Sequence, residues 1–349
     1  MMKLKKIAII FGGQSSEYEV SLKSTVSVLE TLSTCNFEII KIGIDLGGKW
    51  YLTTSNNKDI EYDVWQTDPS LQEIIPCFNN RGFYNKTTNK YFRPDVLFPI
   101  LHGGTGEDGT LQGVFELMNI PYVGCGVTPS AICMDKYLLH EFAQSVGVKS
   151  APTLIIRTRN CKDEIDKFIE KNDFPIFVKP NEAGSSKGIN KVNEPDKLED
   201  ALTEAFKYSK SVIIQKAIIG REIGCAVLGN EKLLVGECDE VSLNSDFFDY
   251  TEKYQMISAK VNIPASISVE FSNEMKKQAQ LLYRLLGCSG LARIDFFLSD
   301  NNEILLNEIN TLPGFTEHSR YPKMMEAVGV TYKEIITKLI NLAEEKYYG

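Results

Sequence analysis

The sequence predicts an α/β protein that opens with a doubly wound parallel sheet and continues into further α/β units. Ile7 to Phe11 is an unbroken apolar run that ends in Gly12-Gly13, the pattern of a buried parallel strand followed by a turn. Similar runs alternate with helical segments over roughly the first third of the chain. At 349 residues the chain exceeds what one hydrophobic core supports, so two or three domains are expected.

The expected elements follow in chain order. In the first third we predict strands at 7–11, 37–44, 96–101 and 121–124 and helices at 20–32 and 109–118, with hairpins and loops over the turn-rich residues 46–91. The middle section predicts helices at 135–146, 162–170 and 196–208 and strands at 153–156, 175–179, 189–192 and 211–216. The last section predicts strands at 222–228, 233–239, 291–298 and 303–309 and helices at 270–286 and 332–346.

Composition narrows the class of function. A net charge of -8 gives no sequence-independent attraction to nucleic acid, so any anionic substrate needs a local cluster of Lys and Arg. The eight cysteines form no CxxC pair and only three histidines are present, which argues against zinc; buried free thiols are the simpler expectation. No segment is long enough to span a bilayer and the N-terminal apolar run is too short for a signal peptide, so a cytoplasmic protein is expected.

Two late strands carry the most informative charged residues. Arg293 and Asp295 are two apart, as are Glu308 and Asn310, so each pair shares one face of its strand. If Asn301-Asn302 is a two-residue turn, Asp295 lies opposite Glu308. Such oxygen donors suit magnesium bound with phosphates. A solvated, charge-paired hairpin is the alternative, and the apolar neighbours of these residues make it the weaker one.

A second candidate is the Gly/Ser-rich loop 184–188, which follows Lys179. Glycines let backbone N–H groups approach phosphate oxygens, and serine hydroxyls add donors. The lysine precedes the loop, so the segment is not the GxxxxGK[ST] phosphate loop. A plain hairpin turn is the alternative, and only Lys179 weighs against it.

Two further segments could bind a ligand. His102 to Thr110 is Gly-rich and follows an apolar strand, where open α/β sheets bind ligands. Glu107 and Asp108 could equally act only as helix caps there, and His102 could be an ordinary hydrogen-bonded histidine. In residues 310–322, Gly314 could present its N–H to a developing oxyanion beside Arg293, or could belong to a structural Pro-Gly turn.

Taken together, these segments resemble the D-alanine–D-alanine ligase family of ATP-grasp enzymes. The matching motifs keep the family's order over almost the whole chain: FGGQSSEYEVS (11–21), LHGGTGEDGTLQG (101–113), MDK (134–136), VKPNEAGSSKGI (178–189), DYTEKY (249–254), RIDFF (293–297) and NEINTLPGFTEHSRYP (307–322). The resemblance implies an N-terminal α/β substrate domain (1–130) followed by a two-domain ATP-grasp (131–216 and 217–349), with residues 242–256 as a lid.

The resemblance also implies roles for individual residues. Glu19 would bind the ammonium of the first substrate with Ser185 and Tyr254 nearby, and His102 would lie near its carboxylate. Arg293 and Gly314 would stabilise the tetrahedral oxyanion. ATP would be bound by Lys136, Lys179, Ser186, Gln215, Lys216, Glu222 and Lys253. Asp295, Glu308 and Asn310 would hold two Mg²⁺ ions, or Mn²⁺ in their place.

Three departures from the family pattern concern the ligands. Gln215 stands where many relatives carry Glu, so altered ATP contacts are expected without loss of ATP. Glu252-Lys253-Tyr254 and His318-Ser319-Arg320 resemble the vancomycin-resistance ligases that make D-alanyl-D-serine. Ser319 and Arg320 would then contact the second substrate, because a polar group rewards a hydroxymethyl where a methyl-sized pocket does not. D-Serine is therefore expected, with D-alanine as the alternative.

Other classes of function remain to be weighed against this one. A carboxylase with the same grasp would phosphorylate bicarbonate, and a nucleotide-binding sensor would be expected to have lost Arg293, Asp295, Glu308 or Asn310, all of which are present. The resemblance implies small-molecule partners and a homodimer, and no nucleic acid or membrane partner.

Overall fold

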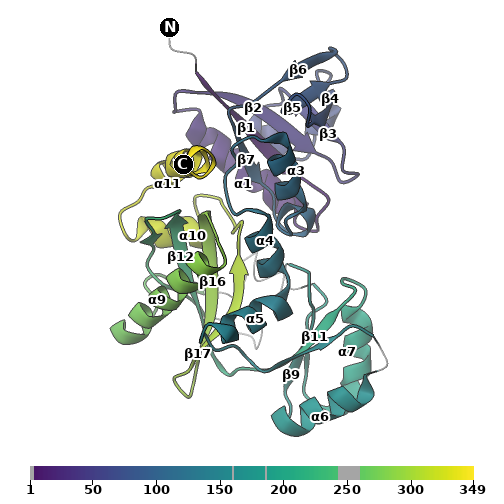
Figure 1. The fold of residues 1–349 in the computed structure, drawn as a ribbon, viewed down its shortest axis with the longest axis vertical. Coiled ribbons are helices and arrows are strands. Elements are labelled where there is room, and N and C mark those ends of the chain that lie inside the picture. The colour runs from purple at the N-terminus through teal and green to yellow at the C-terminus, as the bar shows by residue number, and fades with distance from the viewer. Residues whose placement is uncertain (1–3, 159–160, 185–186, 243–259) are drawn as a thin grey trace.

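The computed structural model describes residues 4–158, 161–184, 187–242 and 260–349, with Ser242 described only in its backbone. Three β-sheets are arranged along the long axis, with the N-terminal sheet at one end and a sheet from the middle of the chain at the other (Figure 1). Among the described helices, none combines the length and the hydropathy of a membrane span.

The N-terminal sheet is parallel at its centre and antiparallel at one side. β1 (Lys5–Gly12) pairs in parallel with β2 (Phe37–Ile44) and with β7 (Val96–Ile100). The predicted hairpins over 46–91 extend this sheet, in the order β6-β5-β4-β3-β2-β1-β7. They comprise β3 (Trp50–Thr53), α2 (Asn57–Glu61), β4 (Gln72–Cys77), β5 (Gly82–Asn85) and β6 (Lys90–Phe92). The expected strand at 121–124 is reduced to an isolated bridge between Leu97 and Tyr122.

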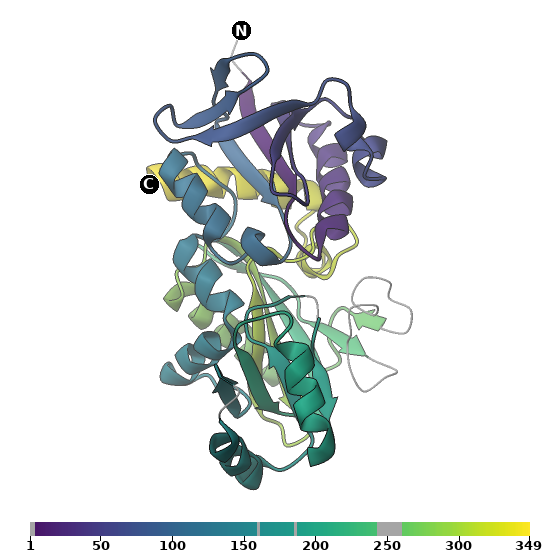
Figure 2. The same ribbon diagram turned by 90° about the vertical axis from the view of Figure 1, so that its right-hand side faces the viewer.

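Both faces of this sheet are covered by helices. α1 (Tyr18–Leu32) and the C-terminal α11 (Tyr332–Tyr348) share one core with the Ile7 side of β1, whereas α3 (Thr110–Met118) packs on the Ala8 side. Alternation along a strand explains why neighbouring apolar residues enter different cores. Figure 2 shows the yellow C-terminal helix against the N-terminal sheet, so packing joins the two ends of the chain.

The middle of the chain forms a four-stranded antiparallel sheet in the order β10-β9-β11-β8. Its strands are β8 (Thr153–Ile156), β9 (Ile176–Pro180), β10 (Asn190–Val192) and β11 (Val212–Lys216). α6 (Lys162–Asn172) and α7 (Leu198–Ala205) contribute apolar residues to its core. α4 (Val127–Met134) and α5 (Lys136–Ser145) connect it to the N-terminal part.

The third sheet carries most of the predicted chemistry. Its main path is β15-β14-β12-β16-β17, and a further short strand, β13, pairs with β12. The strands are β12 (Gly220–Gly229), β13 (Leu234–Val235), β14 (Asp239–Ser242), β15 (Lys260–Asn262), β16 (Gly290–Ser299) and β17 (Ile304–Asn310). α9 (Val269–Leu285) packs on one face, and α10 (Arg320–Glu326) follows the sheet.

The register of β16 and β17 matches the prediction, although the predicted turn does not. Asp295 pairs with Glu308 and Arg293 with Asn310. The turn has three residues between Ser299 and Glu303, and Asn302 adopts a left-handed φ of 62°. A bulge next to Asp295 shifts the register by one residue and restores the pairing that a two-residue turn would have given.

Candidate active site

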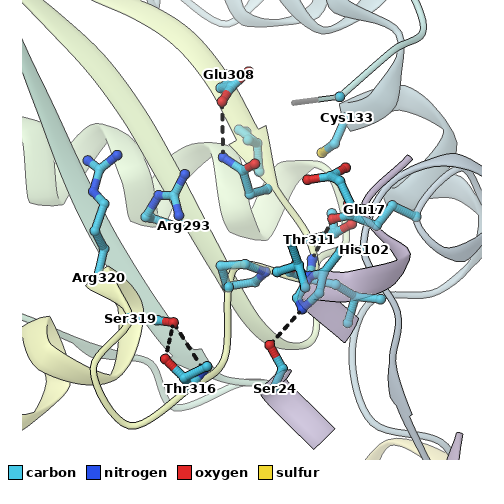
Figure 3. A pocket seen from close by; sticks show the side chains of 18 of the residues that line it. Glu17, Ser24, His102, Cys133, Arg293, Glu308, Thr311, Thr316, Ser319 and Arg320 are labelled. Atoms are coloured by element: carbon cyan, nitrogen blue, oxygen red, sulfur yellow. Dashed lines mark hydrogen bonds between the residues drawn. The ribbon is translucent and has the colours of Figure 1, made fainter. Parts of the chain in front are cut away.

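A cavity of about 960 Å³ lies where the N-terminal loops, the 183–184 segment and the third sheet meet. Figure 3 shows Glu17 and His102 on one side of it and Arg293 and Arg320 on the other. The predicted residues in its lining are Glu19, His102, Lys136, Arg293, Glu308, Asn310, Gly314, Ser319 and Arg320. Residues far apart in sequence therefore converge on one space.

The strand face predicted from residue alternation forms a tight charged cluster. Arg293 Nε donates to both carboxylate oxygens of Asp295, at 2.8 and 3.0 Å, and its Nη2 donates at 2.8 Å. Asn310 Nδ2 donates to Asp295 at 3.0 Å and to Glu308 at 3.5 Å. Asp295 is fully buried, and these contacts pair its carboxyl group with polar partners in the interior.

The same residues fit a hard cation by donor type. Asp295, Glu308 and Asn310 bring two carboxylates and an amide together on adjacent strands, and magnesium prefers such oxygen ligands. Among the described residues, no group of three or more His, Cys, Asp or Glu side chains could hold a metal. Two carboxylates and one amide would leave positions on a hard cation for water or phosphate ligands.

Arg320 extends the cluster toward β12 and β14. Its Nε and Nη2 donate to Asp239 at 2.6 and 2.8 Å, and its Nη1 donates to Glu222 at 3.1 Å. Burial alone would raise the pKa of Asp239, but the charge and hydrogen bonds of Arg320 hold that pKa below its ordinary value. A Cβ on Gly224 would lie 2.4 Å from Asp239 Oδ1, so only glycine leaves room for this pairing.

Three predicted ATP contacts, Lys179, Gln215 and Lys216, lie on the central sheet. Lys179 Nζ donates to Gln215 Oε1 at 2.8 Å, and the amide of Gln215 donates to Thr153 at 3.0 Å. Lys216 Nζ donates to two backbone carbonyls, and Lys136 Nζ donates to that of Ala183 at 2.6 Å. Of the described residues predicted to bind ATP, Lys136 lines the cavity, whereas Lys179, Gln215, Lys216 and Glu222 lie outside its lining.

Glu17 is more deeply placed than the predicted Glu19. Glu19 lines the cavity but is exposed, whereas Glu17 is 7% exposed. A Cβ added to Gly103 or Gly184 would lie 2.2 or 2.8 Å from Glu17 Oε2, so two glycines leave space for this carboxylate. The Gly-rich loops 102–110 and 184–188 thus meet at Glu17, a glutamate that was not predicted as a site residue.

His102 and Glu107 lie beside Glu17 in the loop that follows β7. Burial lowers the pKa of His102, although the charge of Glu17 opposes this. Glu107 keeps some exposed surface, but its carboxylate is enclosed, and burial together with the charge of Glu17 raises its pKa to about 8. The loop therefore holds a neutral imidazole and a carboxyl group that binds a proton unusually strongly.

Four predicted residues, Ser185, Ser186, Lys253 and Tyr254, fall outside the described residues, as does most of the expected lid at 242–256. Near the other end of the cavity, Ser319 Oγ accepts from the Thr316 N–H at 3.0 Å and hydrogen-bonds its hydroxyl at 2.8 Å. A Cβ on Gly314 would lie 3.5 Å from Ser319 Oγ, which brings these two predicted residues together.

Sequence reasoning missed Asp239 and Glu17 and weighed Glu107 only as a cap. Asp239 was expected at the end of a strand at 233–239, two residues from Glu237, but it opens β14 and Glu237 lies outside that strand, so alternation pointed to the wrong neighbour. Its signal would have been the partner Arg320, which is 81 residues away. For Glu17 the signal was present, since it lies within the first Gly-rich motif, but the motif holds two glutamates.

Comparisons with known proteins agree with this geometry. The family descriptions "D-ala D-ala ligase N-terminus" and "D-ala D-ala ligase C-terminus" match residues 6–125 and 142–341. The vancomycin C-type resistance protein VanC2 of Enterococcus casseliflavus is 52% identical over 348 residues, which cover 98% of this chain and 99% of the relative. The D-alanine–D-alanine ligase of Wigglesworthia glossinidia brevipalpis is 41% identical, over 97% and 98%.

A solved structure shows the same architecture. The VanG D-Ala:D-Ser ligase from Enterococcus faecalis has a TM-score of 0.90 at 44% identity, and the match covers 98% of this chain and 100% of that one. The resemblance inferred from the motifs and the expected ATP-grasp fold are thereby confirmed. The chain belongs to the D-alanine–D-alanine ligase family of ATP-dependent ligases.

Proposed function

We propose that this protein joins D-alanine to D-serine at the expense of ATP and supplies the dipeptide for vancomycin-resistant peptidoglycan precursors. The observation that carries the proposal is the cavity in which a buried carboxylate, Glu17, lies across from Arg293 and Glu308. The choice of D-serine is supported by the similarity to VanC2 and to a ligase named for D-Ala and D-Ser. A housekeeping D-alanine–D-alanine ligase is the alternative, at lower identity.

The first substrate would be held by its ammonium and its carboxylate. Glu17 is the better candidate for the ammonium than Glu19, because a buried carboxylate binds a cation more strongly than an exposed one. Ser185 and Tyr254 would complete that contact, and His102 would lie close to the substrate carboxylate. Both ring nitrogens of His102 contact other protein groups, so a neutral His102 would border that carboxylate without adding a positive charge.

The first step forms an acyl phosphate. A carboxylate oxygen of D-alanine attacks the γ-phosphorus of ATP, and ADP leaves. Lys136, Lys179, Lys216 and Lys253 would offset the negative charge, with Ser186, Gln215 and Glu222 placing the nucleotide. Two Mg²⁺ ions, or Mn²⁺, on Asp295, Glu308 and Asn310 would supply further neutralisation of the triphosphate. A lid at 242–256 would keep water from the acyl phosphate.

The second step makes the peptide bond. The second amino acid, after its ammonium has lost a proton, attacks the carbonyl carbon through nitrogen, and inorganic phosphate leaves. Arg293 and the Gly314 N–H would stabilise the negative charge that develops on the carbonyl oxygen. Ser319 and Arg320 would line the second subsite. Arg320 is fixed by Asp239 and Glu222, so it offers a polar wall of set geometry to a hydroxymethyl group.

The test is a competition between D-serine and D-alanine with ATP, Mg²⁺ and D-alanine as first substrate, with the dipeptides identified by mass at several pH values. We expect D-alanyl-D-serine to dominate at equal concentrations. Predominant D-alanyl-D-alanine would establish the housekeeping alternative. ATP hydrolysis that requires bicarbonate and yields no dipeptide would instead indicate a carboxylase, and nucleotide binding without turnover a sensor.

Location and assembly belong to the same proposal. We expect the protein to work in the cytoplasm, where ATP is available. The family resemblance also leads us to expect a homodimer. Size-exclusion chromatography with light scattering at several protein concentrations measures the oligomeric state. A monomer at all concentrations would exclude the homodimer.

A further inference from the structure

Both backbone polar groups of one residue beside the cavity, Leu312, are bound by the loop after β7. The Leu312 N–H donates to Glu107 Oε1 at 3.1 Å. The Leu312 carbonyl oxygen lies 3.0 Å from His102 Nδ1. The two contacts cross 205 and 210 residues of sequence, so they tie the N-terminal part of the chain to the segment that follows β17.

These contacts fix the protonation of the histidine. A carbonyl oxygen only accepts, so His102 must carry a hydrogen on Nδ1 to bind Leu312. In the neutral ring, Nε2 is then an acceptor, and Ser24 Oγ lies 3.2 Å from it and can donate. The buried position of His102, at 5% exposure, agrees with the neutral form. Each hydrogen-bonding atom of the ring thus has a single assignment.

Glu107 is held just as firmly. While Oε1 accepts from Leu312, Oε2 accepts from the Gly103 N–H at 2.6 Å. Gly103 adjoins His102, so the two side chains are linked through the backbone between them. Both carboxylate oxygens of Glu107 are therefore used for positioning.

Leu312 lies two residues before Gly314 in the sequence. Pro313, whose ring fixes φ, is the only residue between them, so a shift of Leu312 is passed directly to the Gly314 N–H. The side chain of Leu312 is also buried, at 7% exposure, in the core that includes Phe98 and Phe315. The position of the Gly314 N–H therefore depends on the contacts that His102 and Glu107, in the loop after β7, make with Leu312.

We propose that His102 and Glu107 form a clasp on the backbone N–H and C=O of Leu312 that positions the Gly314 N–H for the second step of ligation. The inference rests on the proposed function, in which that N–H stabilises the oxyanion. The clasp would link the loop beside the first substrate to the step that consumes the acyl phosphate. Both residues act through Leu312 and are positioning residues in this role.

The proposal predicts uncoupling when the clasp is weakened. In Glu107→Gln, one acceptor oxygen becomes an amide NH₂, which would face the N–H of Gly103 or Leu312. Above about pH 8, where Glu107 is ionised and both of its oxygens accept, loss of a hydrogen bond to this charged group lowers the rate of dipeptide formation by about tenfold or more, so the two proteins are compared there. Formation of the acyl phosphate continues, and water consumes it, so the ratio of ADP formed to dipeptide formed rises by a similar factor.

Asp108→Asn is the matched control. It removes one carboxylate from the same loop, but Asp108 Oδ1 accepts from the Thr110 N–H at 2.8 Å and does not bind Leu312. Its ADP-to-dipeptide ratio should equal that of the unmodified chain. If Glu107→Gln fails to fold, the pair His102→Asn and His102→Ala gives the same information, because the asparagine amide can still donate to Leu312. Coupling should be better in the asparagine variant.

The outcomes separate the clasp from the function on which it rests. A Glu107→Gln enzyme with an unchanged ratio would overturn the clasp, whether its two rates fall together or stay constant. Equal coupling in His102→Asn and His102→Ala would also overturn it. Absence of any dipeptide from the unmodified chain, with every pair of D-amino acids, would refute the proposed function itself.

Discussion

Two walls of the cavity are built in different ways. The strand wall consists of Arg293, Glu308 and Asn310, which extend from two hydrogen-bonded strands, and buried Asp295 binds two of them outside the lining. The loop wall consists of Glu17, His102 and Glu107, which lie in segments that follow β1 and β7. The strand wall holds its charges by side-chain pairing, whereas the loop wall holds its groups by burial and by backbone contacts.

The difference shows why the sequence predicted the side-chain pairing of the strand wall, but only the motif and His102, and not the contacts, of the loop wall. Alternation along a strand places residues i and i+2 on one face, so the strand wall follows from local pattern. The loop wall depends on contacts with glycines and backbone groups far away in sequence. A pattern of neighbouring residues contains no information on such contacts.

The largest expected effect comes from the strand wall. Arg293→Ala removes the fork on buried Asp295 and one of the two groups proposed to stabilise the oxyanion, so dipeptide formation should fall at least about a hundredfold. Nucleotide binding, measured by calorimetry, should remain nearly intact. Arg293→Lys keeps the positive charge but loses the two-pronged contact with Asp295. Its rate of dipeptide formation should lie between those of the unmodified chain and Arg293→Ala. Turnover equal to that of the unmodified chain would remove Arg293 from the mechanism.

The fold was predictable wherever the period of the sequence was clear. β1, β2 and α1 were expected within a few residues of their observed ends. α4 and α10 were missed, because each is short and carries a proline in its first turns, which a helix tolerates only there. The C-terminal helix was expected, but its packing on the N-terminal sheet was not, because helical period does not identify the partner of an apolar face.

The candidate site divides in the same way. The pairing of Asp295 with Glu308 was predicted from a two-residue turn. The turn has three residues, and the bulge beside Asp295 shifts the register by one residue and offsets the longer turn. Glu19 and Glu17 could not be ranked, since only the positions of Gly103 and Gly184 show which carboxylate is buried. The Leu312 contacts have no sequence signature, because backbone groups are the same in every residue.

The second prediction concerns the loop wall and decides between its two glutamates. Glu17→Gln should raise the KM for the first D-alanine by about tenfold or more, since a hydrogen bond to a charged group is lost in a buried place. Glu19→Gln alters an exposed residue in the first turn of α1, and it should change this KM far less. Initial rates at varied D-alanine concentration measure both. A larger effect at Glu19 would return the ammonium to the residue first expected.

The third prediction uses the raised pKa of Glu107. The folded state binds a proton there up to about pH 8, whereas the unfolded chain releases it near the ordinary value of 4.5. The folded state thus holds more protons in this window, so this group's contribution to stability decreases as pH rises, by at most about 1.4 kcal/mol per pH unit.

Urea unfolding of the unmodified chain and of Glu107→Gln should show this difference. The stability of the unmodified chain relative to the variant should be greatest near the acid end of the window and should decline toward pH 8. His102 is present in both proteins, so the largest part of its own titration cancels in the comparison. A difference that stays constant across the window would mean that Glu107 titrates normally.

The smallest effect tests what sets the register of the strand wall. Asn302 has a φ of 62°, which a β-branched residue adopts at a cost of about 1–2 kcal/mol, so Asn302→Val should lower the free energy of unfolding by that amount. Asn301→Val, at a neighbour without positive φ, should cost less, and Asn302→Gly should be nearly neutral. Because the bulge beside Asp295, and not the turn, brings Glu308 into register, dipeptide formation per folded molecule should be unchanged in all three. Loss of activity in folded Asn302→Val would show instead that the turn holds the strand wall in place.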